Sequence, residues 1–318
     1  MARDAVDAVV RAPDLAADLE GRRGGGGRRT RVFLGSGGAR LGAAVLLAVA
    51  VSAATPRVLA PADPNDQRLL ARFTPPLARA AADGPRALLG TDQLGRDILS
   101  RVVHGARTSV LIGLSAVLLA GCLGTSLGLV AGMRGGLADQ LAMRLADMQF
   151  AFPFILLAIT VIGVWGPSIR NTVLVVGLGN WVAYARIVRA ETLAVREKTF
   201  VDAARALGVP LRAIVWRHVL PNVGASLIVV ATFGVAGAIL TEAGLSFLGL
   251  GVPLDVPSWG GMLAEGRQYV DTRYWLALFP GAALFVTVMA INLLGDALRD
   301  ALDPFVQTRQ GRTSVDQL

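Results

Sequence analysis

Six segments without Asp, Glu, Lys or Arg divide the chain into long apolar runs separated by charged stretches. They cover residues 41–56, 108–133, 148–169, 171–185, 219–241 and 274–295. About 20 apolar residues in an α-helix cross a hydrocarbon core about 30 Å thick. Four of the six segments reach this length. Ser36, Gly37 and Gly38 extend the first, and the Arg186 side chain is long enough to reach the membrane surface from the fourth. The pattern predicts an all-α membrane protein with six transmembrane helices.

The predicted spans cover residues about 37–58, 108–132, 148–168, 171–189, 221–243 and 275–295. Together they form a transmembrane domain at 37–305, with an external loop at 59–107 and a cytoplasmic loop at 190–220. Cytoplasmic tails are predicted at 1–36 and 306–318. The first tail is expected to be mobile and basic, because its Asp, Arg and Gly residues cannot bury enough apolar surface to fold.

The composition supports a membrane protein and gives its orientation. Of the 318 residues, 53% are hydrophobic and the mean hydropathy is +0.55, which exceeds what a soluble domain of this size needs. The net charge of +8 fits membrane topology better than nucleic-acid binding, because excess Arg and Lys stay on the cytoplasmic side. With both termini inside, the cytoplasmic segments hold 20 of the 31 basic residues.

An amphipathic helix is predicted just before the second span. Thr91 or Asp92 can cap its N-terminus, and Leu94, Ile98 and Val102 follow at helical spacing. Charged residues at 96, 97 and 101 fall on the opposite side. The sequence therefore predicts a helix that lies at the outer membrane interface.

The cytoplasmic loop carries a second local pattern, a short helix followed by a sharp stop. Alanines at 203, 204 and 206 favour a helix with little side-chain bulk, and Asp202 suits its first turn. Gly208 is predicted to adopt a left-handed cap, and Pro210 prevents the helix from continuing. A second helix is expected to end at Leu220-Pro221, with Pro221 in the first turn of the fifth span.

The spacing in this loop resembles the EAA loop of bacterial ABC-importer permeases. The matching positions are Asp202, Ala203, Ala204, Gly208, Leu220 and Pro221, although Asp202 replaces the usual Glu and His218 the usual Ile. Three further strings resemble the C-type permease of peptide and nickel importers, so that the resemblance covers about residues 35–305. These strings are 90–109, which contains Gly90, Thr91, Asp92, Gly95, Arg96, Asp97, Ser100 and Arg101; 242–263; and 292–304.

The resemblance implies a type I ABC importer permease that carries di- or oligopeptides across the inner (cytoplasmic) membrane. Its partners would be a homologous B-type permease, two ATPase subunits (identical or a bipartite pair), an extracytoplasmic substrate-binding protein and the lipid bilayer. ATP and Mg²⁺ would be bound by the ATPases, so this chain is expected to be no enzyme and to hold no cofactor. The implied ATPase-coupling residues are Asp202, Ala203, Ala204, Arg205, Ala206, Leu207, Gly208, Val209, Pro210, Leu220 and Pro221.

The region after the fifth span has two interpretations. Glu242, Pro257, Ser258, Trp259 and Gly260 form either an outer gate or a contact for the binding protein. Alternatively, Glu242 is an interfacial carboxylate that pairs with an arginine at 267 or 273. In that interpretation Trp259 belongs to the aromatic belt at the membrane surface.

Other functions predict residues that the sequence lacks. The chain has no P-loop string and its only lysine is Lys198, so it supplies no ATPase site of that kind. The central spans contain no charged residue for an ion relay, which disfavours an ATP-independent channel or secondary carrier. The lone Cys122 excludes a disulfide framework and a cysteine metal set. Nickel or another small solute as cargo, and a structural membrane scaffold, stay open as alternatives; nucleic acid is not expected as a partner.

Overall fold

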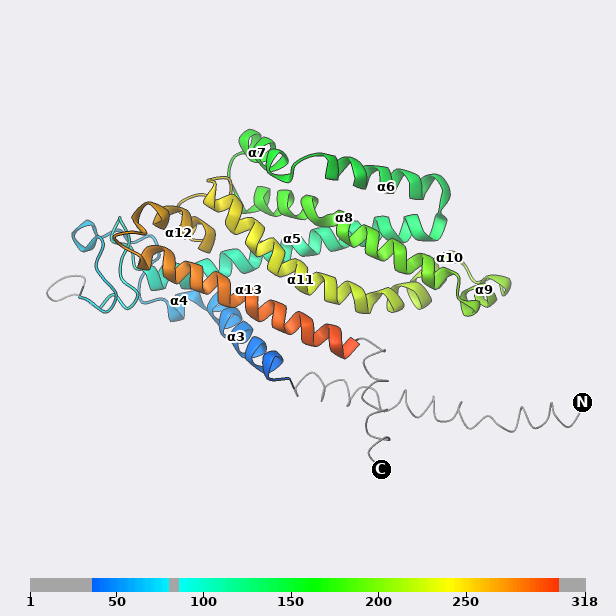
Figure 1. Ribbon diagram of the computed structural model, residues 1–318, viewed down its shortest axis with the longest axis horizontal. Coiled ribbons are helices and arrows are strands. Elements are labelled where there is room, and N and C mark those ends of the chain that lie inside the picture. The colour runs from blue at the N-terminus through cyan, green and yellow to red at the C-terminus, as the bar shows by residue number, and fades with distance from the viewer. Residues whose placement is uncertain (1–35, 80–85, 303–318) are drawn as a thin grey trace, which may run out of the picture.

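The computed structural model describes residues 36–79 and 86–302, which fold into long helices lying side by side (Figure 1). The tails predicted at 1–36 and 306–318 lie outside these residues, apart from Ser36. Within the described ranges no β-strand forms, and the fold is all-α as predicted. The α-helices are α3 (Gly37–Ala54), α4 (Pro56–Leu59), α5 (Ile98–Arg134), α6 (Gly136–Ala151), α7 (Phe154–Trp165), α8 (Ile169–Arg196), α9 (Thr199–Ala206), α10 (Leu211–Ile214), α11 (Leu220–Phe247), α12 (Trp259–Gly266) and α13 (Trp275–Leu302).

Shorter helical segments complete the described chain. They are the 3₁₀ helices Leu69–Ala71 and Arg267–Tyr269 and the π-helical segment Val215–Val219, which joins α10 to α11.

Five helices of the described chain are long and apolar enough to cross a membrane. They are α3, α5, α8, α13 and the continuous helix Leu211–Phe247. The third predicted span, 148–168, is not one helix, because α6 and α7 meet at Pro153 with a bend of 85°. Proline has no N–H for the helix ladder, and it restricts the residue before it to extended backbone. Six spans result if this bent pair is counted as one.

The interface helix and the second span turn out to be one element. Helix α5 runs unbroken for 37 residues, from Ile98 in the predicted external loop through the second predicted span. Its N-terminus is capped by Asp97, whose carboxylate accepts a hydrogen bond from the Ser100 N–H at 2.7 Å. The predicted caps, Thr91 and Asp92, lie earlier in the chain and hold the preceding loop together instead.

The centre of the bundle is the close pair formed by α5 and α8. Glycines on α5 allow this approach: a Cβ on Gly128 would lie 2.6 Å from the Ala185 carbonyl oxygen and 2.9 Å from the Val188 Cβ. Small residues serve the same purpose in other membrane helix pairs, where close van der Waals packing replaces the hydrophobic effect. Helices α11, α13 and α3 pack successively beside this pair.

The two ends of the bundle differ in their short elements (Figure 1). Helices α9 and α10 lie at the end where α5 leads into α6. Helices α4 and α12 and the segment before α5 lie at the opposite end. The predicted topology places the first end in the cytoplasm and the second outside.

Candidate functional site

Helix α9 extends beyond the bundle at the end predicted to be cytoplasmic (Figure 1). Its Val201 side chain is fully buried in an apolar cluster with Val188, Val195 and Val219. Val201 is not among the predicted coupling residues; those that lie on this helix are exposed or half-buried: Asp202, Ala203, Ala204, Arg205 and Ala206. The helix is therefore anchored on one side and offers small and charged side chains on the other.

A left-handed turn ends α9 as the sequence predicts. Gly208 has φ +74°, and its N–H donates to the Arg205 carbonyl at 2.9 Å. The next N–H, of Val209, donates to the Ala204 carbonyl at 3.0 Å, and Pro210 then caps α10. Beside this turn the Leu207 side chain is 83% exposed, which adds an apolar group to the surface of α9.

The chain after the turn continues further than predicted. No helix ends at Leu220-Pro221; α10, the π segment and α11 form one helix from Leu211 to Phe247. Pro221 does lie in the first turn of α11, as expected. The π segment also carries His218, whose ring packs against Phe200 of α9 with centroids 5.7 Å apart. The loop helix and the fifth span are thus in direct contact.

At the opposite end of the bundle, a buried ion-pair cluster joins the external segment to α5 and α12. The Asp92 carboxylate accepts hydrogen bonds from Arg96 Nε at 2.6 Å and from Arg101 at 2.9 Å. Glu265 of α12 accepts two from Arg101, at 2.8 and 3.0 Å, and one each from Arg96 and Gln93. Both arginines are at least 94% buried. The charged side of the predicted interface helix is therefore not a surface: Arg96 and Arg101 are neutralised by acidic partners inside the protein.

The cluster also sets the protonation of Glu265. Burial by itself raises the pKa of this carboxyl, because the charged form loses hydration. The hydrogen bonds and positive charge of Arg101, together with the charge of Arg96, outweigh burial. The net effect lowers the pKa of Glu265 below its ordinary value, so the carboxylate is ionised at neutral pH.

Turns of the external segment bring the remaining motif residues into place. Gly95 has φ +74°, and a Cβ there would lie 1.9 Å from the Arg68 carbonyl oxygen, so only glycine fits. The Thr91 hydroxyl accepts the Thr74 N–H at 2.8 Å. Gly90, also at positive φ, accepts the N–H of Ile98 at its carbonyl oxygen at 3.1 Å. The Ser100 hydroxyl accepts the N–H of Ala62 at the same distance. The motif is therefore a folded external element.

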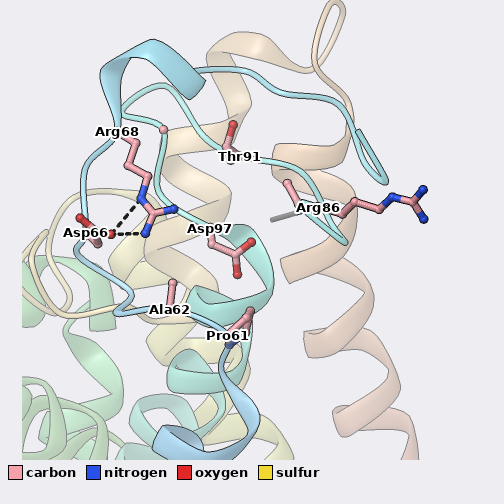
Figure 2. A pocket seen from close by; sticks show the side chains of 9 residues that line it. Pro61, Ala62, Asp66, Arg68, Arg86, Thr91 and Asp97 are labelled. Carbon is pink, nitrogen blue, oxygen red and sulfur yellow. Dashed lines mark hydrogen bonds and ion pairs between the residues drawn. The ribbon is translucent and has the colours of Figure 1, made fainter. Parts of the chain in front are cut away.

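A small cavity of about 90 Å³ opens on the surface of this element (Figure 2). Asp66 and Arg68 form an ion pair at its edge, Asp97 lies at the start of α5, and Arg86 extends away (Figure 2). Below about 300 Å³ a cavity is small for an organic ligand. We therefore interpret it as a hollow between turns.

Glu242 is fully buried near the outer end of α11 and has no arginine partner among the described residues. Its carboxylate accepts hydrogen bonds from Ser246 at 2.7 Å and from Ser109 of α5 at 3.2 Å. The predicted pairing with Arg267 or Arg273 was wrong, since these two arginines lie over aromatic rings instead. Glu242 connects α11 to α5 through Ser109.

The segment that contains Pro257, Ser258, Trp259 and Gly260 is buried as well. Trp259 is 1% exposed, its indole N–H donates to the Val102 carbonyl at 3.0 Å, and its backbone N–H donates to Ser109 at 3.4 Å. Ser258 caps α12 through the N–H of Gly261 at 3.1 Å. Trp259 is therefore no interfacial belt residue, and this segment fastens α12 onto α5 and α11.

Two partners in these clusters were missed from the sequence. Glu265 is the only charged residue of α12, which was the available signal that it is paired. Ser109 offered no signal beyond its place in the motif. Among the residues in the described ranges, no group of three or more His, Cys, Asp or Glu side chains is placed to hold a metal ion.

Comparison with known proteins gives concordant matches. Residues 124–308 match the family described as binding-protein-dependent transport system inner membrane component. The chain is 44% identical over 246 residues to the di/tripeptide transport system permease protein DppC of Pseudomonas aeruginosa, with 77% of this chain and 81% of that protein covered. It is 45% identical over 224 residues to the glutathione transport system permease protein GsiD of Pectobacterium atrosepticum, with 70% and 74% covered.

A solved structure has the same fold. The inward-facing MetNI methionine ABC transporter has a chain that matches with a TM-score of 0.52 at 19% identity. The match covers 64% of this chain and 96% of that one. The architecture is that of ABC-importer permeases.

Proposed function

We propose a mechanism for this chain from the premise that it belongs to the family of binding-protein-dependent transport system inner membrane components. It is a multi-pass cell-membrane protein and a permease subunit of an ABC importer. We assign di- and oligopeptides as its cargo, because the relatives that cover most of the chain are named for dipeptides, tripeptides and glutathione, itself a tripeptide. Nickel or another small solute is the alternative within the same class.

The geometry of α9 is the observation that carries the mechanism. This helix is exposed on one side and its Ala203, Ala206 and Leu207 side chains are small or apolar, so a groove on another protein can approach its backbone closely. Asp202 and Arg205 lie beside them with 3.7 Å between their charged groups. Such a surface is suited to dock in an ATPase subunit, with Gly208 setting the angle at which α9 meets the bundle.

Force applied to α9 has two direct routes into the membrane domain. Val201 packs in one apolar cluster with Val188 and Val195 of α8 and with Val223 of α11. The Phe200–His218 ring contact forms the second route, onto the π segment. Because the helix continues unbroken to Phe247, movement at the loop is transmitted to the outer end of the fifth span. Alternating access then follows from rotation of these helices.

The remaining partners follow from the same function. A homologous permease completes the translocation path, and an external binding protein delivers the peptide to the side that carries α12. Two ATPase subunits bind ATP and Mg²⁺, so this chain acts as a non-enzymatic subunit without a cofactor of its own. The absence of a P-loop assigns ATP binding to separate subunits, and the absence of an ion relay in the central spans disfavours an ATP-independent carrier.

Replacing Gly208 by leucine tests the coupling role. Gly208 has positive φ and open space around it, so leucine strains the turn by about 1–2 kcal/mol without an internal clash and adds bulk to the docking surface. Gly136 is the matched control, since it has φ +55°, open space, and lies in the other cytoplasmic turn. We expect Gly208→Leu to reduce ATP-dependent peptide uptake at least tenfold in proteoliposomes, and Gly136→Leu to retain it.

Each part of the proposal has an outcome that would overturn it. Full uptake by correctly inserted Gly208→Leu contradicts coupling through α9. Affinity purification of the tagged chain from native membranes is expected to recover a second permease, ATPase subunits and a binding protein. Recovery of the chain alone, with solute transport in liposomes without ATP, would instead support a carrier.

A further inference from the structure

The bend between α6 and α7 interrupts a segment that the sequence predicts to lie inside the membrane. Residues 148–169 carry no charge, yet α6 ends at Ala151 and α7 starts at Phe154. Phe152 is extended, with φ −95° and ψ 129°, and Pro153 follows without an N–H. The chain therefore changes direction by 85° within an apolar run.

Backbone polar groups at such a break cannot face lipid. The last carbonyls of one helix and the first N–H groups of the next have no partner within their own helix. No side chain caps the N-terminus of α7, and the α6 end gains one bond, from the Phe152 N–H to the Gln149 carbonyl at 3.2 Å. Irregular backbone at membrane depth is tolerated only where it is buried in protein or lines a water-filled cavity.

A cavity of about 650 Å³ lies at this break. This volume falls in the range of about 300–1,000 Å³ that is typical of small-molecule sites. Its polar lining is uncharged and comes from Gln149 of α6, Asn180 of α8 and Thr241 of α11. Aromatic and aliphatic side chains provide the rest: Phe150, Phe152, Pro153, Phe154, Leu157, Leu178 and Trp181, with Gly179 among them.

The polar groups of the lining are held in fixed positions. Gln149 donates to the Leu178 and Gly179 carbonyls at 2.7 and 3.0 Å and accepts the indole N–H of Trp181. Asn180 donates to the Val176 carbonyl at 2.8 Å. Within the described residues its side-chain oxygen and second N–H keep their capacity to bond a ligand. The cavity thus combines aromatic walls with an amide.

A charged pair at the edge of the cavity indicates water rather than lipid. Arg186 of α8 donates to Asp147 of α6 at 2.6 Å and lies 4.9 Å from the centre of the Phe150 ring, which lines the cavity. The two charged side chains are 48% and 67% exposed, although both lie next to apolar spans. Arg186 thus pairs between two helices, and its expected reach to the membrane surface stays a prediction. Exposed charges beside apolar spans require hydration or protein around them.

We propose that this cavity is the part of the peptide path that the chain itself lines, with a short peptide as its transient occupant. The proposal rests on the proposed function. The aromatic walls accept side chains of different shapes, and Asn180 and Thr241 bond the peptide backbone, which every cargo shares. An uncharged lining does not trap one class of side chain, as transient passage requires.

Thiol accessibility tests the proposal on the complete importer in lipid nanodiscs, where reagents reach both faces. The native cysteine is first removed as Cys122→Ala. In this background, Phe152→Cys reports on the cavity, and Leu47→Cys on α3 is the control. The two positions are matched because the native side chains are apolar and similarly exposed, at 71% and 66%. A charged, membrane-impermeant methanethiosulfonate reacts with the thiolate, which forms in water and not in hydrocarbon. We expect Phe152→Cys to react at least tenfold faster than Leu47→Cys.

Protection by the cargo is the second readout. We expect modification of Phe152→Cys to slow at least threefold when a di- or tripeptide is added together with the binding protein and a non-hydrolysable ATP analogue. Thr241→Cys serves as a second reporter if the first variant fails to assemble. Slow labelling at both cavity positions would mean that lipid or the partner permease fills the space, and fast labelling without protection would exclude the peptide; either overturns the proposal. Uptake by the unsubstituted importer, measured in parallel, tests the proposed function separately.

Discussion

Removal of the Glu265 carboxylate is the sharpest test of the buried ion-pair cluster. In Glu265→Ala, Arg96 and Arg101 keep Asp92 as their one acidic partner, which leaves an excess positive charge in a region at least 94% buried. Gln93 loses its acceptor as well. Breaking a buried pair by removing one partner costs about 3–5 kcal/mol. Glu265→Gln, which keeps the shape and one acceptor oxygen, is expected to fall between the alanine variant and the native chain.

The Asp66–Arg68 pair supplies a matched control on the same external element. Its ion-pair distance is 2.8 Å, but the side chains are 50% and 44% exposed, so Asp66→Ala is expected to cost about 0–1 kcal/mol. Hydrogen exchange on the purified importer measures both effects locally, because the N–H groups of Leu94 and Arg96 bond to Asp92.

The two costs convert into different changes in protection. At 1.4 kcal/mol per factor of ten, Glu265→Ala should speed exchange in peptides covering 92–101 by roughly two to three and a half orders of magnitude, and Asp66→Ala by less than tenfold. Similar changes in the two variants would refute the argument, because burial would then not decide the strength of the pair. No change in Glu265→Ala would refute it as well.

Three further outcomes follow from packing, protonation and hydrogen bonding. Gly128→Ala places a Cβ 2.6 Å from a backbone oxygen and should lower the free energy of unfolding by about 1–3 kcal/mol. Gly121→Ala should not, because its Cβ would lie 3.8 Å from the nearest atom, which is ordinary contact distance. The pKa of Glu265 is lowered on folding, so its contribution to stability is present above its unfolded pKa and lost as pH falls through the folded pKa. Exchange at 92–101, corrected for intrinsic rates, should therefore rise as the pH falls below the ordinary glutamate pKa of about 4.3. Trp259→Phe removes the indole donor from the Val102 carbonyl, which keeps the hydrogen bond of its own helix, and should cost about 0.5–1.5 kcal/mol in thermal unfolding. Trp165→Phe, at a side chain 64% exposed, should cost about nothing.

The features that sequence analysis predicted are those that a single segment dictates. Runs without a charged residue favour membrane helices, and five of the six predicted spans appear as helices at the expected places, including the two shorter runs at 41–56 and 171–185. The exception is 148–169, where Pro153 interrupts an uncharged run of 22 residues. The turn at Gly208 was equally local, since a proline two residues later stops the helix and glycine tolerates positive φ.

The features that were missed depend on partners far away in the sequence. Arg96 and Arg101 look like the polar face of an interface helix, and only the fold brings Glu265, 164 residues after Arg101, into contact with both. Glu242 likewise bonds to Ser109 and Ser246 instead of the predicted Arg267 or Arg273. Residue type predicts that a buried charge needs a partner, but it does not identify the partner.

Two prolines show why local rules do not fix helix boundaries. Pro221 follows a π-helical segment, and the helix continues through it from Leu211 to Phe247. Pro153 follows an extended residue, and the helix axis bends by 85°. Both residues lack the N–H of the ladder, so the difference comes from the backbone before them, which packing selects.

The contacts at both ends of the bundle connect the two proposals. Helices α5 and α8 pack too closely at Gly128 to slide independently, Val201 joins α9 to α8 and α11, and Glu242 joins α11 to α5 at the outer end. In the proposed mechanism, a push on α9 moves these three long helices as one body. The α6–α7 bend lies beside that body. Helix α6 is held to α8 by the hydrogen bond between Gln149 and Trp181 and by the ion pairs Asp147–Arg186 and Asp139–Arg189, whose side chains are all at least a fifth exposed to solvent. Rotation of this body against α6 and α7 would change the cavity at the bend, which is where we propose that the transported peptide is bound and released.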